Sequence, residues 1–263
     1  MRAEGKIAAI TGATGAIGKA IARQMAMHGG YKVVLLCRDE NRAKNLVREL
    51  QQETGNNNID YKVTDLSLHS SVQTLSENWQ GPLHVLINNA ATTPIQREVT
   101  VEGIERQWAT NVLGYFWMMH KFSTILKASA PARIVNVASY WAGELDLRDP
   151  EFKNRRYNNN TAYRQSKQAD RMLTAAFAER LSHTGITVNA CHPGDVNSRL
   201  SNDLGFGGHE TPDEGADTPV WLATDPQLTT TSGKYFERRK ETKCHFAANK
   251  REVDLLMQLC ESY

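Results

Sequence analysis

The chain has 263 residues, enough for one large domain or two small ones, and its composition is that of an ordinary globular protein. Its formal net charge is only +2, with both signs mixed along the chain, so nothing indicates a nucleic-acid partner. No apolar run approaches the roughly 20 residues of a membrane span, and no signal sequence is expected before the first apolar run, so we expect a cytoplasmic protein.

Apolar runs that indicate strands alternate with stretches that indicate helices. The strands are predicted at Lys6–Ile10, Lys32–Cys37, Ile59–Val63, His84–Asn88, Arg133–Val137, Thr187–Cys191 and Lys234–Phe236. The helices are predicted near 16–28, 40–53, 69–79, 101–128, 162–183 and 213–224. Most strand runs are continuously apolar, which is typical of strands buried on both faces of a parallel sheet. We therefore predict one α/β domain over 1–263, a Rossmann fold whose doubly wound, seven-stranded parallel sheet has helices on both faces.

A glycine-rich turn follows the first predicted strand and opens the first predicted helix. Its residues are Gly12, Ala13, Thr14, Gly15, Ala16, Ile17 and Gly18. Glycines let the backbone come close to a pyrophosphate, and the helix N-terminus offers free N–H groups, so the turn is a candidate dinucleotide site. The spacing fits either GxxGxxG or TGxxxGxG with Ala16 as the middle residue, and a plain tight loop is the alternative.

Three polar strand ends are candidate contacts for a dinucleotide, the first two of them for its adenosine half. Arg38 follows the second strand, where an arginine favours the 2′-phosphate of NADP, while the adjacent Asp39 keeps NAD as the less favoured option. Asp65 and Leu66 follow the third strand, where a carboxylate can accept from an adenine amino group or simply fix a turn. Asn89 and Ala90 end the fourth strand, where an amide and a small residue suit a backbone that passes close to a cofactor.

Three residues form a candidate acid–base group. Ser139 ends the fifth strand, and Tyr163 and Lys167 lie four residues apart on one face of the next helix. A nearby ammonium lowers the pKa of a phenol, and a serine hydroxyl can hold a carbonyl or alcohol oxygen beside it. YxxxK alone is common on helix surfaces, and its order after the glycine-rich turn and Ser139 is what favours catalysis.

In combination these motifs resemble the short-chain dehydrogenase/reductase family. The matching features are Thr11–Gly18, Asn88–Ala91, Asn111, Ser139, Tyr163 with Lys167, and His192-Pro193-Gly194. The long segment between Ser139 and Tyr163 is similar to the retinol-dehydrogenase-like and WW-domain-oxidoreductase-like branch. Ala91 stands where glycine is usual in the family, and Ala138 where a second serine is frequent, but neither change removes a reacting group.

The resemblance implies a role for each matched residue. Tyr163 would be the general acid/base, Lys167 would lower its pKa and hold the nicotinamide ribose, and Ser139 would orient the reacting oxygen. Asn111 would fix a water in a proton relay. Pro193 and Gly194 would run beside the nicotinamide, with Val196 and Ser198 near its carboxamide.

The expected activity is that of an NADP(H)-dependent carbonyl reductase or alcohol dehydrogenase acting on a small apolar ketone, aldehyde or alcohol. A substrate lid is expected near 195–217, with an ordinary surface loop as the alternative. The alternatives in function are a non-catalytic NADP(H)-binding regulatory protein and a sugar epimerase or dehydratase. The resemblance also implies a homodimer or homotetramer, formed through the helices near 101–128 and 162–183.

No metal site is expected. The four cysteines, Cys37, Cys191, Cys244 and Cys260, form no CxxC pair, so neither zinc binding nor a redox motif is indicated.

Overall fold

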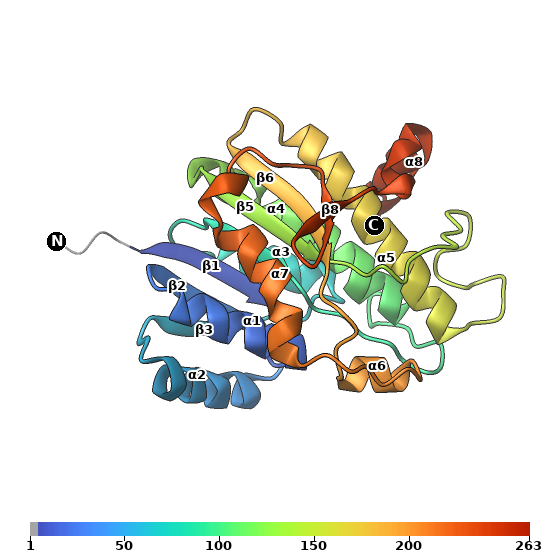
Figure 1. The fold of residues 1–263 in the computed structure, drawn as a ribbon. Coiled ribbons are helices and arrows are strands. Elements are labelled where there is room, and N and C mark those ends of the chain that lie inside the picture. The colour runs from blue at the N-terminus through green and yellow to red at the C-terminus, as the bar shows by residue number, and fades with distance from the viewer. Residues whose placement is uncertain (1–4) are drawn as a thin grey trace.

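An eight-stranded sheet runs through residues 5–263, the part of the chain that the computed structural model describes (Figure 1). The strands are β1 (Lys6–Thr11), β2 (Tyr31–Cys37), β3 (Ile59–Val63), β4 (Val85–Asn88), β5 (Ala132–Val137), β6 (Ile186–His192), β7 (Tyr235–Glu237) and β8 (Lys240–Thr242). Their spatial order is β3-β2-β1-β4-β5-β6-β7-β8. The order reverses between β1 and β4, and in open α/β sheets ligands bind at such a switch point beyond the carboxyl ends of the strands.

Strands β1 to β7 are parallel, as the sequence predicts, but the sheet has one strand more than expected. β8 pairs antiparallel with β7, with Tyr235 opposite Thr242. The hairpin turns at Arg238 and Arg239, which both have positive φ. The sequence offered no signal for this strand, because Lys240-Glu241-Thr242 has no apolar run and pairs only through its backbone.

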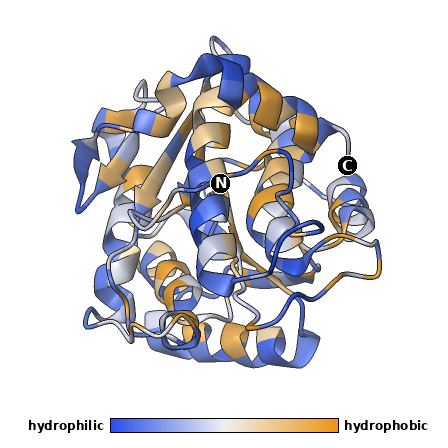
Figure 2. Cartoon of the chain, turned by 90° about the vertical axis from the view of Figure 1, so that its right-hand side faces the viewer, coloured by the Kyte–Doolittle hydropathy of each residue, from blue (hydrophilic) through white to orange (hydrophobic). Residues whose placement is uncertain are grey.

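Helices cover both faces of the sheet (Figure 1). They are α1 (Ala16–Met27), α2 (Glu40–Thr54), α3 (His69–Glu77), α4 (Gly114–Ala128), α5 (Asn159–Arg180), α6 (Arg199–Asp203), α7 (Pro212–Thr224) and α8 (Lys250–Glu261). The short turns are the 3-10 helices η2 (Pro226–Leu228) and η3 (His245–Ala248). One core lies between the sheet and α1, α2 and α7, and the other between the sheet and α3, α4, α5 and α8. In Figure 2 the helices carry hydrophobic and hydrophilic stripes, as amphipathic helices on a sheet should.

The helix predicted over 101–128 is wrong in its first part. Residues 101–105 form no helix, since Gly103 turns with φ of +83° and Val99 pairs with Glu105 in an isolated bridge. A π-helix, η1 (Trp108–Leu113), then leads into α4. Residues 108–119 are all buried, but hydropathy does not distinguish a π-turn from an α-helix.

The C-terminal segment forms the amphipathic helix α8. Val253, Leu256 and Met257 are buried in the core beside α5, and Arg180 of α5 forms an ion pair with Glu261. α8 thus covers part of the α5 surface, and a contact between subunits through α5 would have to use the remainder. No helix within residues 5–263 is long and apolar enough to span a bilayer.

Candidate active site

The turn between β1 and α1 forms a cradle with free backbone donors. Gly15 occupies the N-cap of α1, no side chain caps the helix, and its first turn carries no acidic residue. By contrast, Asp39 caps α2 and Asn158 caps α5 through side-chain oxygens. The first N–H groups of α1 are therefore available to an anion at the positive end of the helix dipole.

Two glycines of this turn have no room for a side chain. Gly12 has φ of +64°, and a Cβ there would lie 2.7 Å from the Cα of Ala90. A Cβ on Gly18 would overlap the carbonyl oxygen of Gly12 and lie 2.7 Å from the amide nitrogen of Asn89. Gly15, with φ of −81°, would place a Cβ 3.3 Å from the same carbonyl. Gly12 and Gly18 are thus the two positions of this turn where the backbone packing excludes a side chain.

Thr11 links this turn to the end of β4. Its hydroxyl accepts from the backbone N–H of Asn89 at 2.8 Å and of Ala90 at 3.1 Å. The side-chain amide of Asn89 donates to the Thr11 carbonyl at 3.0 Å. The sequence analysis gave Thr11 no separate role, although its position as the first residue of the turn was a visible signal.

The end of β2 presents Arg38 to solvent, while Asp39 is engaged. The Asp39 carboxylate accepts from the backbone N–H of Arg42 at 3.0 Å as the N-cap of α2. The Arg42 guanidinium donates to the Thr14 carbonyl at 3.1 Å, beside the glycine-rich turn. Cys37 is buried, and burial raises the pKa of its thiol to about 11. Of the charged residues at this strand end, Arg38 is the one whose side chain is exposed and has no hydrogen bond or ion pair within residues 5–263.

Asp65 fixes a turn after β3. One oxygen of its carboxylate accepts from both the backbone N–H of Ser67 at 2.9 Å and the Ser67 hydroxyl at 2.7 Å. Leu66 is buried in the core against Gly114 of α4. The geometry favours the turn alternative for Asp65, and the adenine contact stays a prediction.

Ser139, Tyr163 and Lys167 come together beyond the carboxyl end of β5. Ser139 and Tyr163 line one cavity, and Tyr163 and Lys167 are almost fully buried. The Lys167 ammonium donates to the Val137 carbonyl at 3.0 Å and to a carboxylate oxygen of Asp170 at 2.9 Å. It lies 5.8 Å from the centre of the Tyr163 ring. The side chains predicted to form the acid–base group are therefore neighbours in the fold.

The pKa of Tyr163 reflects opposing influences. Burial raises it, while the Lys167 ammonium and a hydrogen bond with the Ser139 hydroxyl lower it, and the net pKa lies above the ordinary value for tyrosine. The sequence analysis expected Lys167 to bring the pKa down. Lys167 does lower the pKa of Tyr163, but desolvation by burial raises it by more.

Asn111 lies in the π-helix η1 with its side chain fully buried. Its side-chain oxygen accepts from the Thr92 N–H at 2.9 Å, and its amide donates to the Thr92 carbonyl at 3.1 Å and to the Ser166 hydroxyl at 3.3 Å. These bonds join η1 to the loop after β4 and to α5. They explain a polar residue in an apolar helix, and π-turns are frequent at functional sites. The water relay itself stays a prediction.

The cavity beside Tyr163 has a volume of about 460 Å³ and an aromatic wall. Trp141 lies 6.0 Å from the Tyr163 ring and 5.6 Å from Phe206 between ring centres, and Tyr140 packs edge-on against His192 at 4.5 Å. Phe206 lies within the expected lid, 195–217, but the sequence motifs indicated no role for Tyr140 and Trp141. Their place directly after Ser139 was the signal.

The segment after β6 closes the same cavity. Pro193, Gly194, Val196 and Ser198 line it, as does Ile17 from α1. The Ser198 hydroxyl caps α6 by accepting from the Ser201 N–H at 3.2 Å. Glu210 approaches Gly194 so closely that a Cβ there would overlap its carboxylate, and its other oxygen accepts from Arg238 at 3.2 Å. The predicted nicotinamide contacts thus lie along one wall.

His192 makes stability depend on pH. Burial lowers the pKa of its imidazole from 6.5 to about 4, so the folded state binds fewer protons than the unfolded chain between these values. Stability is then lost as the pH falls from about 6.5 towards 4, by about 2 kcal/mol at pH 5. In urea denaturation, the free energy of unfolding of His192→Asn should decline less over this range than that of the wild type. Parallel curves for the two proteins would contradict the assignment.

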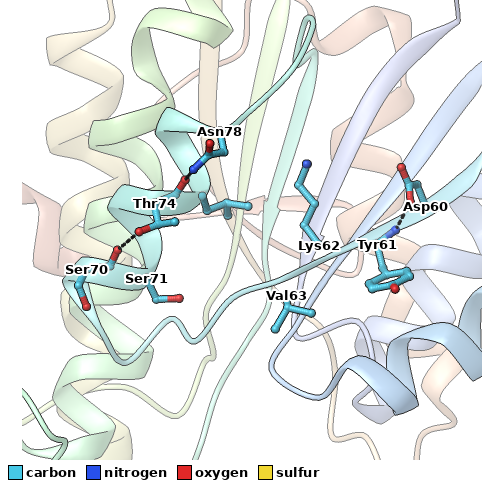
Figure 3. A pocket seen from close by; sticks show the side chains of 9 residues that line it. Asp60, Tyr61, Lys62, Val63, Ser70, Ser71, Thr74 and Asn78 are labelled. Atoms are coloured by element: carbon cyan, nitrogen blue, oxygen red, sulfur yellow. Dashed lines mark hydrogen bonds between the residues drawn. The ribbon is translucent and has the colours of Figure 1, made fainter.

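A larger hollow of about 610 Å³ lies on another side of the molecule, between β3 and α3. Figure 3 shows its lining, which includes Tyr61, Lys62 and Val63 from the strand and Ser70 and Thr74 from the helix. It contains no residue of the predicted site. Within residues 5–263, no group of three His, Cys, Asp or Glu side chains is arranged to hold a metal ion.

Comparison with known proteins agrees with this geometry. The family described as short chain dehydrogenase matches residues 6–205. Retinol dehydrogenase 13 from Homo sapiens is 32% identical over 257 residues, covering 90% of this chain and 77% of its own, which confirms the expected kinship with retinol dehydrogenases. An uncharacterised protein from Mycobacterium paratuberculosis superimposes with a TM-score of 0.82 at 26% identity, covering 98% of this chain and 92% of its own. The 3-ketoacyl-(acyl-carrier-protein) reductase from Brucella melitensis, in complex with NADH, has a TM-score of 0.67 at 25% identity and covers 90% and 99%.

Proposed function

The chain belongs to the short-chain dehydrogenase family, and we propose that it is an NADP(H)-dependent carbonyl reductase or alcohol dehydrogenase. The observation that carries the proposal is the buried pair of Tyr163 and Lys167, which lies beside Ser139 at the wall of the aromatic cavity. The glycine cradle and the uncapped N-terminus of α1 fit the pyrophosphate of a dinucleotide. When bound, the cofactor supplies or accepts the hydride.

In this proposal, residues of this chain donate and accept the proton. In reduction, the Tyr163 hydroxyl donates its proton to the carbonyl oxygen, and in oxidation its phenolate accepts the proton of the alcohol. Ser139 orients that oxygen, and the Lys167 ammonium stabilises the phenolate. Because its pKa lies above the ordinary value, the Tyr163 hydroxyl is protonated at neutral pH and can act as the proton donor in reduction.

The proposed preference for NADP(H) rests on the end of β2. Asp39, the carboxylate that would hold the 2′-hydroxyl of NAD, already caps α2, while Arg38 is exposed and available to a 2′-phosphate. Because the related Brucella melitensis reductase is in complex with NADH, the family alone does not select the cofactor.

Replacing Arg38 by Ala should weaken NADPH binding by about 10- to 100-fold, since a charge-assisted hydrogen bond contributes about 1.5–3 kcal/mol. NADH binding should change little. Fluorescence titration of both cofactors into the wild type and the variant measures this, with Lys62→Ala on the far hollow as the control. Tighter binding of NADH than NADPH by the wild type would refute the preference.

The substrate is proposed to be a small apolar ketone, aldehyde or alcohol. Trp141 and Phe206 give the cavity an apolar wall, and Phe206 lies in the segment 195–217, which we propose as the lid. A panel of carbonyl compounds with the preferred cofactor tests the function. Turnover of apolar ketones or aldehydes is expected.

The two alternative functions predict other outcomes of this panel. Cofactor binding without turnover of any carbonyl or alcohol would indicate a regulatory protein. Turnover of nucleotide sugars alone would indicate an epimerase or dehydratase. The intact set of Ser139, Tyr163 and Lys167 favours catalysis over the first alternative. The Pro193-Gly194 wall favours a dehydrogenase or reductase over the second.

A cytoplasmic location and a homodimer or homotetramer also belong to the proposal. The four cysteines are free thiols, which suits a reducing compartment. Fractionation of cells and size-exclusion chromatography of the purified protein would test these two points.

A further inference from the structure

A buried carboxylate lies next to the proposed catalytic lysine. Asp170 follows Lys167 by three residues on α5, so both side chains share one face of the helix. Neither side chain is exposed by more than 2%, and the Lys167 ammonium lies 2.9 Å from one oxygen of the Asp170 carboxylate. The other oxygen is buried without a hydrogen-bond partner among the described residues. Burying a carboxylate costs desolvation free energy, which an opposite charge or hydrogen bonds must offset.

The Lys167 ammonium has two roles, as a hydrogen-bond donor and as a positive charge beside Tyr163. Its N–H groups donate to Val137 and Asp170, and its positive charge is also what stabilises the Tyr163 phenolate. Burial alone would lower the pKa of Lys167, but the Asp170 carboxylate raises it above the ordinary value. Asp170 therefore keeps Lys167 charged inside the core, and it also competes with Tyr163 for that charge.

The titratable groups around this pair come from every element packed against it. They are Tyr115 of α4, Tyr163 of α5, Cys191 of β6, Asp195 of the loop after β6 and Cys260 of α8. Burial raises the pKa of both thiols and of Tyr115, so these three groups are neutral near pH 7. The charges that Tyr163 meets are thus Lys167, which lowers its pKa, and Asp170 and Asp195, which raise it.

We propose that Asp170 is a positioning residue. Its carboxylate anchors the Lys167 ammonium against β5 and partly neutralises the electrostatic effect of that ammonium on the Tyr163 hydroxyl. Tyr163 then stays protonated at neutral pH and is poised to donate a proton to a carbonyl. This inference rests on the proposed function, in which Tyr163 is the general acid/base. It goes beyond that function by assigning to Asp170 an upward effect on the pKa of Tyr163.

The test replaces Asp170 by Asn, which keeps the shape and removes the charge. Without the Asp170 carboxylate, Lys167 still donates to the Val137 carbonyl, and the Tyr163 phenolate favours the charged ammonium as it forms. The ammonium then acts on Tyr163 without the opposing carboxylate, so Tyr163 should ionise at a lower pH, by about one unit. Two readouts measure this: the ultraviolet absorbance of the Tyr163 phenolate without cofactor, obtained as the difference from a matched Tyr163→Phe protein, and the pH profile of kcat/KM for alcohol oxidation. The rising limb of that profile should move to lower pH with the absorbance.

Burial raises the pKa of Asp170 to about 7, so Asp170 is ionised at the alkaline pH where a tyrosine titrates. Glu105→Gln is the matched control, because burial raises the pKa of Glu105 to about 7 as well, yet Glu105 does not contact Lys167. Its pH profile and phenolate titration should equal those of the wild type. Asp170→Ser serves as a second variant in case Asp170→Asn does not fold. An unchanged phenolate titration, a shift to higher pH, or failure of both Asp170 variants to fold would overturn the assignment. Absence of turnover in the wild type, with the expected absorbance shift, would refute the proposed function alone.

Discussion

Tyr163→Phe is expected to lower kcat by about 10²–10⁴-fold and to leave the affinity for NADPH nearly unchanged. The change removes one hydroxyl from a side chain that is 7% exposed and keeps the ring that packs against Trp141. The proton then has no donor in reduction and no acceptor in oxidation, whereas the cradle at α1 is untouched. Steady-state kinetics with an active carbonyl from the panel, together with a fluorescence titration of NADPH, measures both quantities.

Tyr61→Phe provides the comparison for this prediction. Its hydroxyl donates to Glu40 at 3.1 Å on the surface of β3, far from the cavity, so turnover should match the wild type. If Tyr163→Phe retains near-normal turnover, Tyr163 is not the general acid/base and the proposed mechanism fails. If NADPH affinity falls together with turnover, the effect on kcat would not isolate proton transfer.

Gly18→Ala is expected to reduce NADPH affinity by more than 10-fold and to destabilise the protein by about 1–3 kcal/mol. The added Cβ would overlap the Gly12 carbonyl oxygen and lie 2.9 Å from the Cα of Ala13, and these backbone atoms cannot move without reshaping the turn. Moving them displaces the N–H groups offered to the pyrophosphate. Urea denaturation and NADPH titration give the two magnitudes.

Gly15→Ala tests whether the steric requirement is specific to Gly18. The two glycines share the turn, but a Cβ on Gly15 would meet a single atom at 3.3 Å, and its φ of −81° suits any residue. We expect it to retain most of the NADPH affinity and stability. Equal losses in the two variants would show that the whole turn, rather than the approach of α1 at Gly18, limits cofactor binding.

Local signals in the sequence were sufficient for the parallel sheet and for most helices. A continuous apolar run such as 33–37 is typical of a strand buried between two layers of helices, so it predicts both the strand and its place in a doubly wound fold. The signals failed where structure depends on distant partners. β8 exists only because its backbone pairs with β7, and η1 differs from an α-helix in hydrogen bonding that hydropathy does not record.

Some features of the candidate site could likewise be predicted from the sequence, and others depend on the tertiary structure. The sequence by itself determined the family, the glycine-rich turn, and the order in which Ser139, Tyr163 and Lys167 occur, because these depend on residue type and short spacing. Only the tertiary structure decided that Asp39 caps a helix and that Asp170 forms an ion pair with Lys167. It also decided that burial raises the pKa of Tyr163 by more than Lys167 lowers it. These outcomes depend on how far water is excluded and on which groups the fold brings within a few ångströms, and neither quantity is encoded at any single position of the chain.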